Sequence, residues 1–385
     1  MRCLNRNDIL DYVRMRRAFF DAASATNPFV GSDWLERFIE HVAQDDWRFI
    51  APEHRDETSS LMLLYSRADD PQRWFSVTNH YASLYTPLIG ATQQHAAVAR
   101  VLAERITRET PDCISINCAP LDGDAAGTVA LERAFAEQGW HTKRYSCFGN
   151  WYLPCAGLSF ERYLHGRDAM LRTTVARKTR RFELGEDGAR LVLLSTPAEV
   201  EAGMAAYERL RTRSWNRAEP YPDFVHAWAR TCAQRGWLRL GLAFVHDTPI
   251  AAQFWFTRHR RAYIFKLAYD ESYARFSAPT VLSAHMIRHS LEVDRVEEID
   301  YLTGDDVYKR AWMPRRRERI GLMLCNPRTM RGQLLSTHQL ASEARQRWLR
   351  STRPAPMSAL PRDKRRLAAR QAGGHNADVS ASHHA

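Results

Sequence analysis

Residues 273–280 combine residue types that can hold an anion at the start of a helix. Ser277 is a good helix cap, Pro279 stands where a first-turn proline costs no hydrogen bond, and Arg275 can neutralise a phosphate. A helix is predicted over residues 280–293. Its unpaired N–H groups and its dipole would both favour a phosphate at this end. The sequence therefore predicts an anion site here.

The segment Leu171–Arg181 contains five basic residues and no acidic one. In a helix, Arg177, Arg180 and Arg181 lie along one face, with Lys178 at its edge. This face either holds an anionic acceptor, such as a nucleotide sugar, a polysaccharide or an RNA backbone, or is simply solvated. The pattern of charges does not decide between the two, and the similar run at residues 315–319 is equally ambiguous.

Two carboxylates, Asp305 and Asp306, follow Gly304 directly before a short predicted helix. Either one could cap that helix, act as a general base, or bind a substrate ammonium. His285 and His289 are four residues apart, but no third ligand accompanies them, so we expect no metal site.

The composition excludes several classes of protein. With 385 residues, 45% of them hydrophobic and 26% charged, the chain has the balance of a globular protein. No apolar run is long enough to cross a bilayer, no signal peptide is evident, and the seven cysteines form no CxxC pair, so we expect a cytoplasmic protein. Residues 328–385 carry a net charge of +8 out of the chain's +11, so the body is not that of a uniformly basic nucleic-acid binder.

The predicted elements fall into two similar series. Each series runs helices, three strands, helix, strand, helix, strand, although residue identity between the halves is negligible. We therefore predict an α/β fold made of two tandem units, each with a mixed sheet flanked by helices. The predicted boundaries are an N-terminal unit at 1–155, a C-terminal unit at 156–327, a helix at 328–350 and a disordered basic tail at 351–385.

This order of elements is that of the GNAT acyltransferase fold, and three stretches carry a closer resemblance. They are Lys266–Tyr273, the loop at 273–280, and Glu298–Trp312 with its Gly-Asp-Asp-Val-Tyr-Lys-Arg-Ala-Trp ending. With weaker matches around residues 149–153, Trp215 and 236–253, they resemble the BioF2-like acetyltransferase family. That family groups with the FemAB-like tandem GNAT proteins and includes CelD-type members. The resemblance covers about residues 25–330.

The resemblance implies acetyl-CoA as co-substrate, no metal, and roles for particular residues. The thioester carbonyl would lie against backbone N–H groups of Leu267, Ala268 and Tyr269. The pyrophosphate would rest on Arg275, Ser277, Ala278, Pro279 and Thr280. Tyr308 would be the acid for the leaving thiolate, unless it is a core residue. Lys309 is typical of the FemAB-like group and could lower the pKa of Tyr308 or hold an anion. Asp305 and Asp306 stay as catalytic candidates, and Arg177, Arg181 and Trp215 are assigned to the acceptor.

The phosphate loop departs from the usual (Gln/Arg)-x-x-Gly-x-(Gly/Ala) pattern. Ala278 replaces the first glycine and Thr280 the final small residue. Glycines there allow the pyrophosphate to approach the backbone closely. In the first half the corresponding loop, residues 84–92, has Gly90 but no basic residue. We expect that loop to bind no CoA and to shape the acceptor cleft.

The function predicted from the sequence is transfer of an acyl group, acetyl first, from CoA to an amine of a sugar or cell-envelope precursor. One alternative keeps the fold and uses aminoacyl-tRNA as donor, as FemAB-like enzymes do. Against it, nothing between Pro249 and Cys325 leaves room for their helical arm. The other alternative is a non-catalytic binding protein. In either case the basic tail could contact RNA or an acidic surface weakly.

Overall fold

A computed structural model describes residues 3–54, 60–90, 94–214 and 219–337, and every structural statement below refers to these residues. The chain divides into two compact units, residues 1–332 and residues 333–385. Most of the second unit lies outside the described residues. The first unit contains both predicted copies of the α/β fold.

One twelve-stranded sheet runs through the first unit in the order β1-β2-β5-β6-β7-β14-β8-β13-β12-β11-β10-β9. The strands are β1 Cys3–Leu4, β2 Trp47–Ile50, β5 Leu64–Arg67, β6 Asp70–Ser76, β7 Ser115–Asp122, β8 His141–Pro154, β9 Ala189–Leu194, β10 Leu238–Val245, β11 Thr248–Arg258, β12 Arg261–Tyr269, β13 Glu298–Asp300 and β14 Arg315–Cys325, with β3 Glu53–His54 and β4 Ser60–Leu61 in a separate pair. The α-helices are α1 Arg6–Met15, α2 Arg17–Ala23, α3 Ser32–His41, α4 His95–Glu109, α5 Ala126–Glu137, α6 Phe160–His165, α7 Ala169–Glu183, α8 Val200–Ser214, α9 Pro222–Gln234, α10 Ala278–Glu292 and α11 Val307–Trp312.

The two halves of the sheet repeat one pairing pattern. In the N-terminal half, β1, β2, β5 and β6 are antiparallel neighbours, and β6 then pairs parallel with β7. In the C-terminal half, β9, β10, β11 and β12 are antiparallel neighbours, and β12 pairs parallel with β13. A helix makes the crossover in both halves, α4 in the first and α10 in the second. The structure therefore confirms the predicted tandem α/β architecture.

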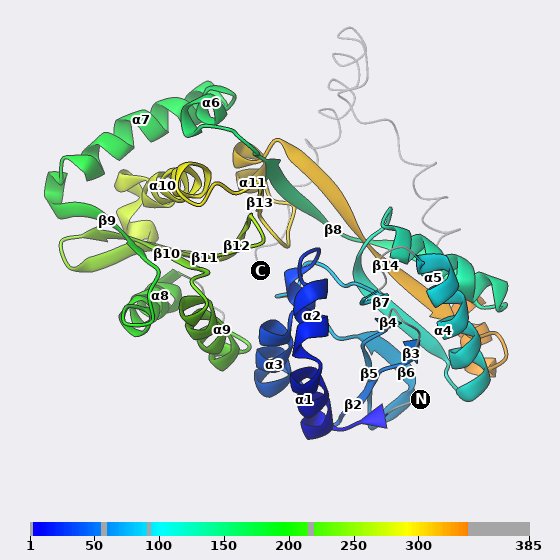
Figure 1. Cartoon of the computed structure of the whole chain (residues 1–385). Helices are drawn as coiled ribbons and strands as arrows, with labels where there is room; N and C mark the ends of the chain where they lie inside the picture. Colours follow the sequence, from blue (N-terminus) through cyan, green and yellow to red (C-terminus); the bar gives the residue numbers. More distant parts are fainter. Residues whose placement is uncertain (1–2, 55–59, 91–93, 215–218, 338–385) are drawn as a thin grey trace, which may run out of the picture. The chain divides into compact units, whose positions relative to one another are not determined.

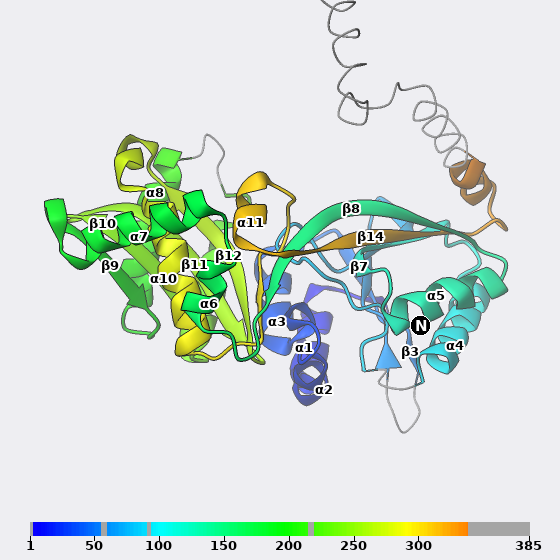
Figure 2. The same cartoon turned by 90° about the horizontal axis from the view of Figure 1, so that it is seen from above.

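The halves are joined by an exchange of two long strands, β8 and β14 (Figures 1 and 2). β14, from the end of the C-terminal half, pairs with β7 of the N-terminal half. β8, which ends the N-terminal half, pairs with β13 of the C-terminal half. The two strands also pair with each other along the whole length of β14. Each half therefore completes its sheet with a strand from the other.

Three hydrophobic cores lie on the faces of this sheet. The central core packs α1–α3 of the first half against α8 and α9 of the second. A second core lies under α6, α7 and α10 on the opposite face of the C-terminal half, and a third under α4 and α5 on the N-terminal half. Figure 1 shows α7 and α10 on one side of strands β9–β12, with α8 and α9 on the other.

Most predicted elements are present, with three differences. Helices α1 and α2 are not among the predicted elements. β14 begins at Arg315 and so includes the charged run at 315–319, because these residues pair with β8. Of the helix predicted at 328–350, residues 330–337 are helical and the rest lies outside the described residues, as does the tail at 351–385. Among the described helices, none has the length and apolar character needed to span a bilayer.

Candidate active site in the C-terminal half

The site is built around a gap between the parallel strands β12 and β13. Their pairing stops at Tyr263 and Asp300, while β12 continues to Tyr269. Along that extension β12 pairs only with β11. In the described part of the chain, no hydrogen bond joins residues 264–269 to residues 301–306. Strand β12 therefore leaves one backbone edge without a partner strand, and this edge includes Leu267, Ala268 and Tyr269.

The corresponding gap of the N-terminal half is bridged by hydroxyl groups. β6 and β7 stop pairing at Phe75 and Asn117. Beyond that point Ser76 Oγ and Thr78 Oγ1 donate to the carbonyl of Ala119 at 2.7 and 2.6 Å, and the Ala119 N–H donates back to Ser76 Oγ. These bonds hold β6 and β7 together at the position where β12 and β13 of the C-terminal half are apart. Only the C-terminal half thus has an open strand edge in this position.

The predicted phosphate loop lies at the start of α10, directly after β12, but offers few backbone donors. Ser277 stands at the N-cap in a left-handed conformation, with φ of 51°, and its side chain makes no capping bond. Pro279 has no N–H, and the N–H groups of Thr280 and Val281 both donate to the Ser277 carbonyl. Ala278 is the remaining donor of the first turn. Ser277 therefore occupies the predicted N-cap position, although its hydroxyl leaves the first-turn N–H groups uncapped.

Basic side chains from α7 lie against this loop. Lys178 Nζ donates to the carbonyl of Arg275 at 2.5 Å. The Arg181 guanidinium stacks on Phe276, 4.3 Å from the ring centroid, and pairs with Asp187. Burial, followed by the charges of Arg177 and Arg181, lowers the pKa of Lys178. The basic helix and the loop, predicted as separate features, thus form one cationic cluster of Arg177, Lys178, Arg181 and Arg275.

Tyr308 joins this region through a chain of buried polar groups. Its hydroxyl is 3.0 Å from Ser283 Oγ on α10. Ser283 accepts a hydrogen bond from Gln253 Nε2 at 2.8 Å, and Gln253 accepts one from Trp255 Nε1 at 3.0 Å. Tyr308 is 38% exposed, and burial raises the pKa of Tyr308 above the ordinary value. The hydroxyl is consequently held in its protonated form.

Lys309 points away from the Tyr308 hydroxyl. Its Nζ donates to the Thr303 carbonyl and lies 3.6 Å from Asp306 Oδ2. Burial lowers the pKa of Lys309, and Lys309 is not among the groups that shift Tyr308. The expectation that Lys309 lowers the pKa of Tyr308 is therefore not met. The ammonium instead ties down the loop between β13 and α11.

The two aspartates separate into different roles. Asp306 caps α11, accepting from the Lys309 N–H at 3.1 Å. Asp305 accepts two hydrogen bonds from Arg316 Nε and one from Nη2 at 2.7 Å, and a further one from Trp151 Nε1 at 2.7 Å. The Arg316 bonds, then that of Trp151, lower the pKa of Asp305. Both carboxylates are thus engaged within the protein.

The arginine run at 315–319 is used in the same internal way. Besides Arg316, Arg317 contacts Asp300 at 2.5 Å and Glu298 at 2.9 Å, and Arg319 contacts Asp122 at 3.2 Å. These pairs lie where β14 passes between β8 and β7. Arg316, Arg317 and Arg319 therefore hold the exchanged strand through ion pairs within the protein, while Arg315 is exposed.

A charged cluster on the other face of β12 was not anticipated from the sequence. Glu219 accepts from Lys266 Nζ at 2.9 and 3.0 Å, from Tyr81 Oη, and lies 3.1 Å from Arg211 Nε. Burial alone would raise the pKa of Glu219, but the Tyr81 hydrogen bond and the cations Lys266 and Arg211 outweigh burial and lower it. A lysine within an otherwise apolar strand was the available signal.

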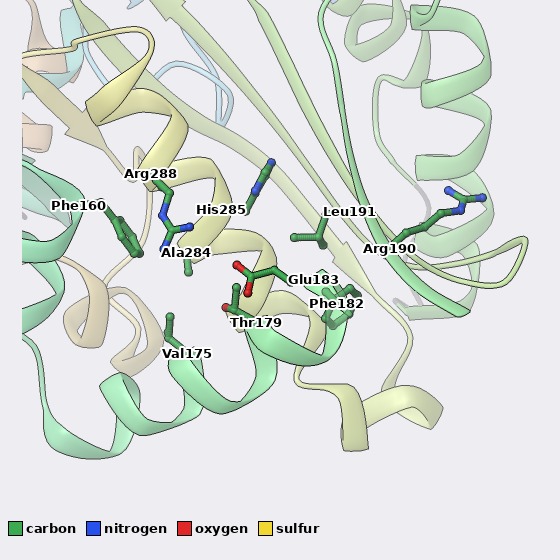
Figure 3. Close-up of a pocket in the computed structure, with 10 residues that line it drawn as sticks. All are labelled: Phe160, Val175, Thr179, Phe182, Glu183, Arg190, Leu191, Ala284, His285 and Arg288. Atoms are coloured by element: carbon green, nitrogen blue, oxygen red, sulfur yellow. The ribbon is translucent and has the colours of Figure 1, made fainter. Parts of the chain in front are cut away.

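A separate cavity of about 410 Å³ lies between α7, α10 and β9 (Figure 3). Phe160, Val175 and Leu191 form its apolar side, and Glu183 and Arg288 are among its polar lining residues. None of the predicted site residues that the structure describes lines it. Trp215, predicted to contact the acceptor, lies outside the described residues.

Comparison with known proteins bears on the fold and on the class of reaction. The family model of the acetyltransferase (GNAT) domain matches residues 169–310. A search of curated proteins gives no match.

Three solved structures match this chain at low sequence identity, and the two with TM-scores above 0.5 have a similar fold. The C-terminal domain of a putative lysylphosphatidylglycerol synthetase from Agrobacterium fabrum is 10% identical, with a TM-score of 0.51 over 85% of this chain and 95% of that one. The crystal structure of FemX is 9% identical, with a TM-score of 0.56 over 80% and 95% of the two chains. A tandem GNAT protein from the clavulanic acid pathway is 13% identical, with a TM-score of 0.43 over 83% and 96%.

The first two likenesses concern the fold alone, and the predicted resemblance to BioF2-like and CelD-type proteins stays a prediction. The chain folds as two tandem GNAT-like units, and the match over residues 169–310, which contains β12, the loop and Tyr308, supports an acyltransferase in general.

Proposed function

We propose that the protein is an acyl-CoA-dependent N-acyltransferase, with acetyl as the acyl group and the C-terminal half as its catalytic half. The observation that carries this proposal is the position of the cationic cluster. Arg275, Lys178 and Arg181 meet at the start of α10, next to the open edge of β12. No ion pair to the Arg275 guanidinium is found among the described residues, so this cation is available to a phosphate.

In this proposal a bound acyl-CoA supplies the thioester, and the residues of the chain orient and stabilise it. Arg275 and Lys178 would hold the phosphates. Backbone N–H groups of Leu267–Tyr269 would donate to the thioester carbonyl oxygen as negative charge develops on it. The amine nitrogen would bond to the carbonyl carbon, and as the C–S bond breaks Tyr308 would give its proton to the sulfur. The proton lost by the nitrogen would restore the Tyr308 hydroxyl, directly or through water. The raised pKa of Tyr308 keeps its hydroxyl protonated, as a proton donor must be.

The acceptor proposed is an amine of a sugar or cell-envelope precursor, as the family resemblance suggests. It would approach from the face of β12 that carries Lys266 and Glu219, opposite α10. Asp305 and Asp306 are poor candidates for the base, because Arg316 and the helix cap engage them. We keep them as orienting residues of the loop that carries Tyr308.

Calorimetric titration with acetyl-CoA and with free CoA tests this function. Arg275→Glu places a like charge beside the phosphates and should weaken binding of both ligands at least tenfold. Arg162→Glu, at an exposed position of α6, makes the same change in net charge away from the loop and should bind as the wild type does. If Arg275→Glu leaves the affinity for CoA and acetyl-CoA unchanged, the phosphates do not bind at this loop.

A second donor, aminoacyl-tRNA, is favoured by one observation. The start of α10 has a single free first-turn N–H, at Ala278, so phosphate binding would fall to long cationic side chains that suit any phosphodiester. Against it, residues 249–325 are all described and hold no helical arm between β11 and β14. If neither CoA nor acetyl-CoA binds, transfer from a charged tRNA is the next assay.

A further inference from the structure

The N-terminal half contains a cavity of about 940 Å³. It lies between α2, the loop at residues 84–90 and the start of α5. That loop is the counterpart of the phosphate loop in the other half. A volume of this size is in the range of small-molecule sites. The cavity is therefore a candidate site independent of the gap at β12.

The start of α5 provides an unpaired polar end to this cavity. Ala125, at the N-cap, gives no side-chain capping bond. The N–H groups of Ala126 and Gly127 have no acceptor among the described residues, and both residues line the cavity. Thr128 also lines it, and although Thr128 is only 1% exposed its hydroxyl makes no hydrogen bond. A buried hydroxyl without a partner is costly, so this end suits a ligand acceptor atom.

The charged residues around the cavity are compatible with a negatively charged group. Arg16 is held by Glu53 at 3.2 Å and lies over the ring of Phe19. The carboxylate of Asp122 is compensated by Arg319 at 3.2 Å. The ring of His95, the first residue of α4, lies close to α5, since a Cβ on Gly127 would be 3.4 Å from its Cδ2. The α5 dipole adds a partial positive charge.

The rest of the lining is mainly apolar and includes Phe19, Ala23, Leu84, Pro87 and Leu88. An apolar wall ending at two free N–H groups and a free hydroxyl matches a molecule with an apolar body and an anionic end. We propose that the N-terminal half binds such an amphiphilic anion, a carboxylate or phosphate attached to an apolar chain. The anionic end accepts from Ala126, Gly127 and Thr128, and the chain lies along α2 and the 84–90 loop.

Calorimetric titration of the full chain with decanoate, decyl phosphate and decanol tests this proposal. One molecule of at least one anion should bind, and decanol, which has the same chain but no charge, should bind at least tenfold more weakly. The two anions distinguish a carboxylate from a phosphate headgroup. Failure of both to bind, or equal affinity for decanol, would overturn the proposal.

Three variants locate the site. Ala126→Trp, at an exposed position of the cavity mouth, should abolish binding. Thr128→Val removes only the hydroxyl and should weaken binding of the anion by roughly threefold to tenfold. Val129→Thr, on the exposed side of α5, should leave binding unchanged. Retained affinity in both Ala126→Trp and Thr128→Val would overturn the assignment. This titration uses other ligands and other variants than the acetyl-CoA titration. The outcome of one therefore does not decide the outcome of the other.

Discussion

At the residue scale, the proposed reaction depends most on the Tyr308 hydroxyl, which is fixed by Ser283 at 3.0 Å. Tyr308→Phe removes the proposed acid without changing the phosphate-binding loop. We expect kcat for acetyl transfer to fall by roughly a hundredfold, with acetyl-CoA affinity unchanged by calorimetry. Tyr145→Phe, whose hydroxyl bonds Asn117 in the other half, is the matched control. An unchanged kcat in Tyr308→Phe would exclude Tyr308 from the chemistry.

The pH profile gives a second readout for the same residue. Burial raises the pKa of Tyr308 above its ordinary value, about 10 for tyrosine. The hydroxyl therefore stays protonated in mildly alkaline solution. At pH values under about 10, ionisation of Tyr308 should not lower kcat. A descending limb near pH 8 that disappears in Tyr308→Phe would contradict this.

The sequence predicted the elements that carry Tyr308, the loop and the basic residues, because each has a local signature in residue type and spacing. It did not separate Asp305 from Asp306, since either could cap a helix that follows both. The role of each aspartate depends on its hydrogen-bond partners, and the partners of Asp305, Arg316 and Trp151, come from other strands. Glu219 and Tyr81 were missed for the same reason, because they meet only through folding.

At the element scale, the Glu219 cluster fixes β12 to α8 and to the segment that carries Tyr81. The side chains of Glu219 and Lys266 are 8% and 17% exposed. Glu219→Gln leaves two cations without their carboxylate, so the free energy of unfolding should fall by about 2–4 kcal/mol, measured by urea denaturation. Glu201→Gln breaks the exposed pair with Arg230 and should cost under about 1 kcal/mol. Adding Lys266→Met to Glu219→Gln should restore part of the loss.

The lowered pKa of Glu219 sets the direction of its acid sensitivity. Its contribution to stability is fully present above the ordinary glutamate pKa, about 4.3, and is lost as pH falls through the lower value in the folded state. The wild type should therefore lose more stability than Glu219→Gln between about pH 5 and pH 3. Equal losses would show that Glu219 does not ionise differently in the folded chain.

Helix and strand identities were largely predictable, because alternation and helical periodicity mark most of them. The start of β14 was not, since five residues that include four arginines resemble a solvated segment. Their pairing with Glu298, Asp300 and Asp122 appears only when three strands are brought together. Charge compensation across strands thus overrides the local preference for solvent.

At the scale of the whole molecule, the exchange of β8 and β14 makes each half depend on the other. β14 fills the place between β7 and β8, and β8 in turn fills the place beside β13. Sequence order alone predicts two successive units and gives no sign of this exchange, because the exchange is a property of long-range pairing.

Cutting the chain at the predicted boundary, between residues 155 and 156, tests that dependence. Fragment 1–155 would keep β7 and β8 without β14 between them, and fragment 156–332 would keep β13 paired with β12 but without β8 on its other side. Open strand edges of this kind are unstable in water, so neither fragment should show a cooperative thermal transition by circular dichroism. Co-expressed, the two should co-elute as a one-to-one complex that melts in one transition, as the full chain does. A cooperative melt of monomeric fragment 1–155 would mean that the N-terminal half closes its own sheet, and the exchanged strands would then be a connection between autonomous domains.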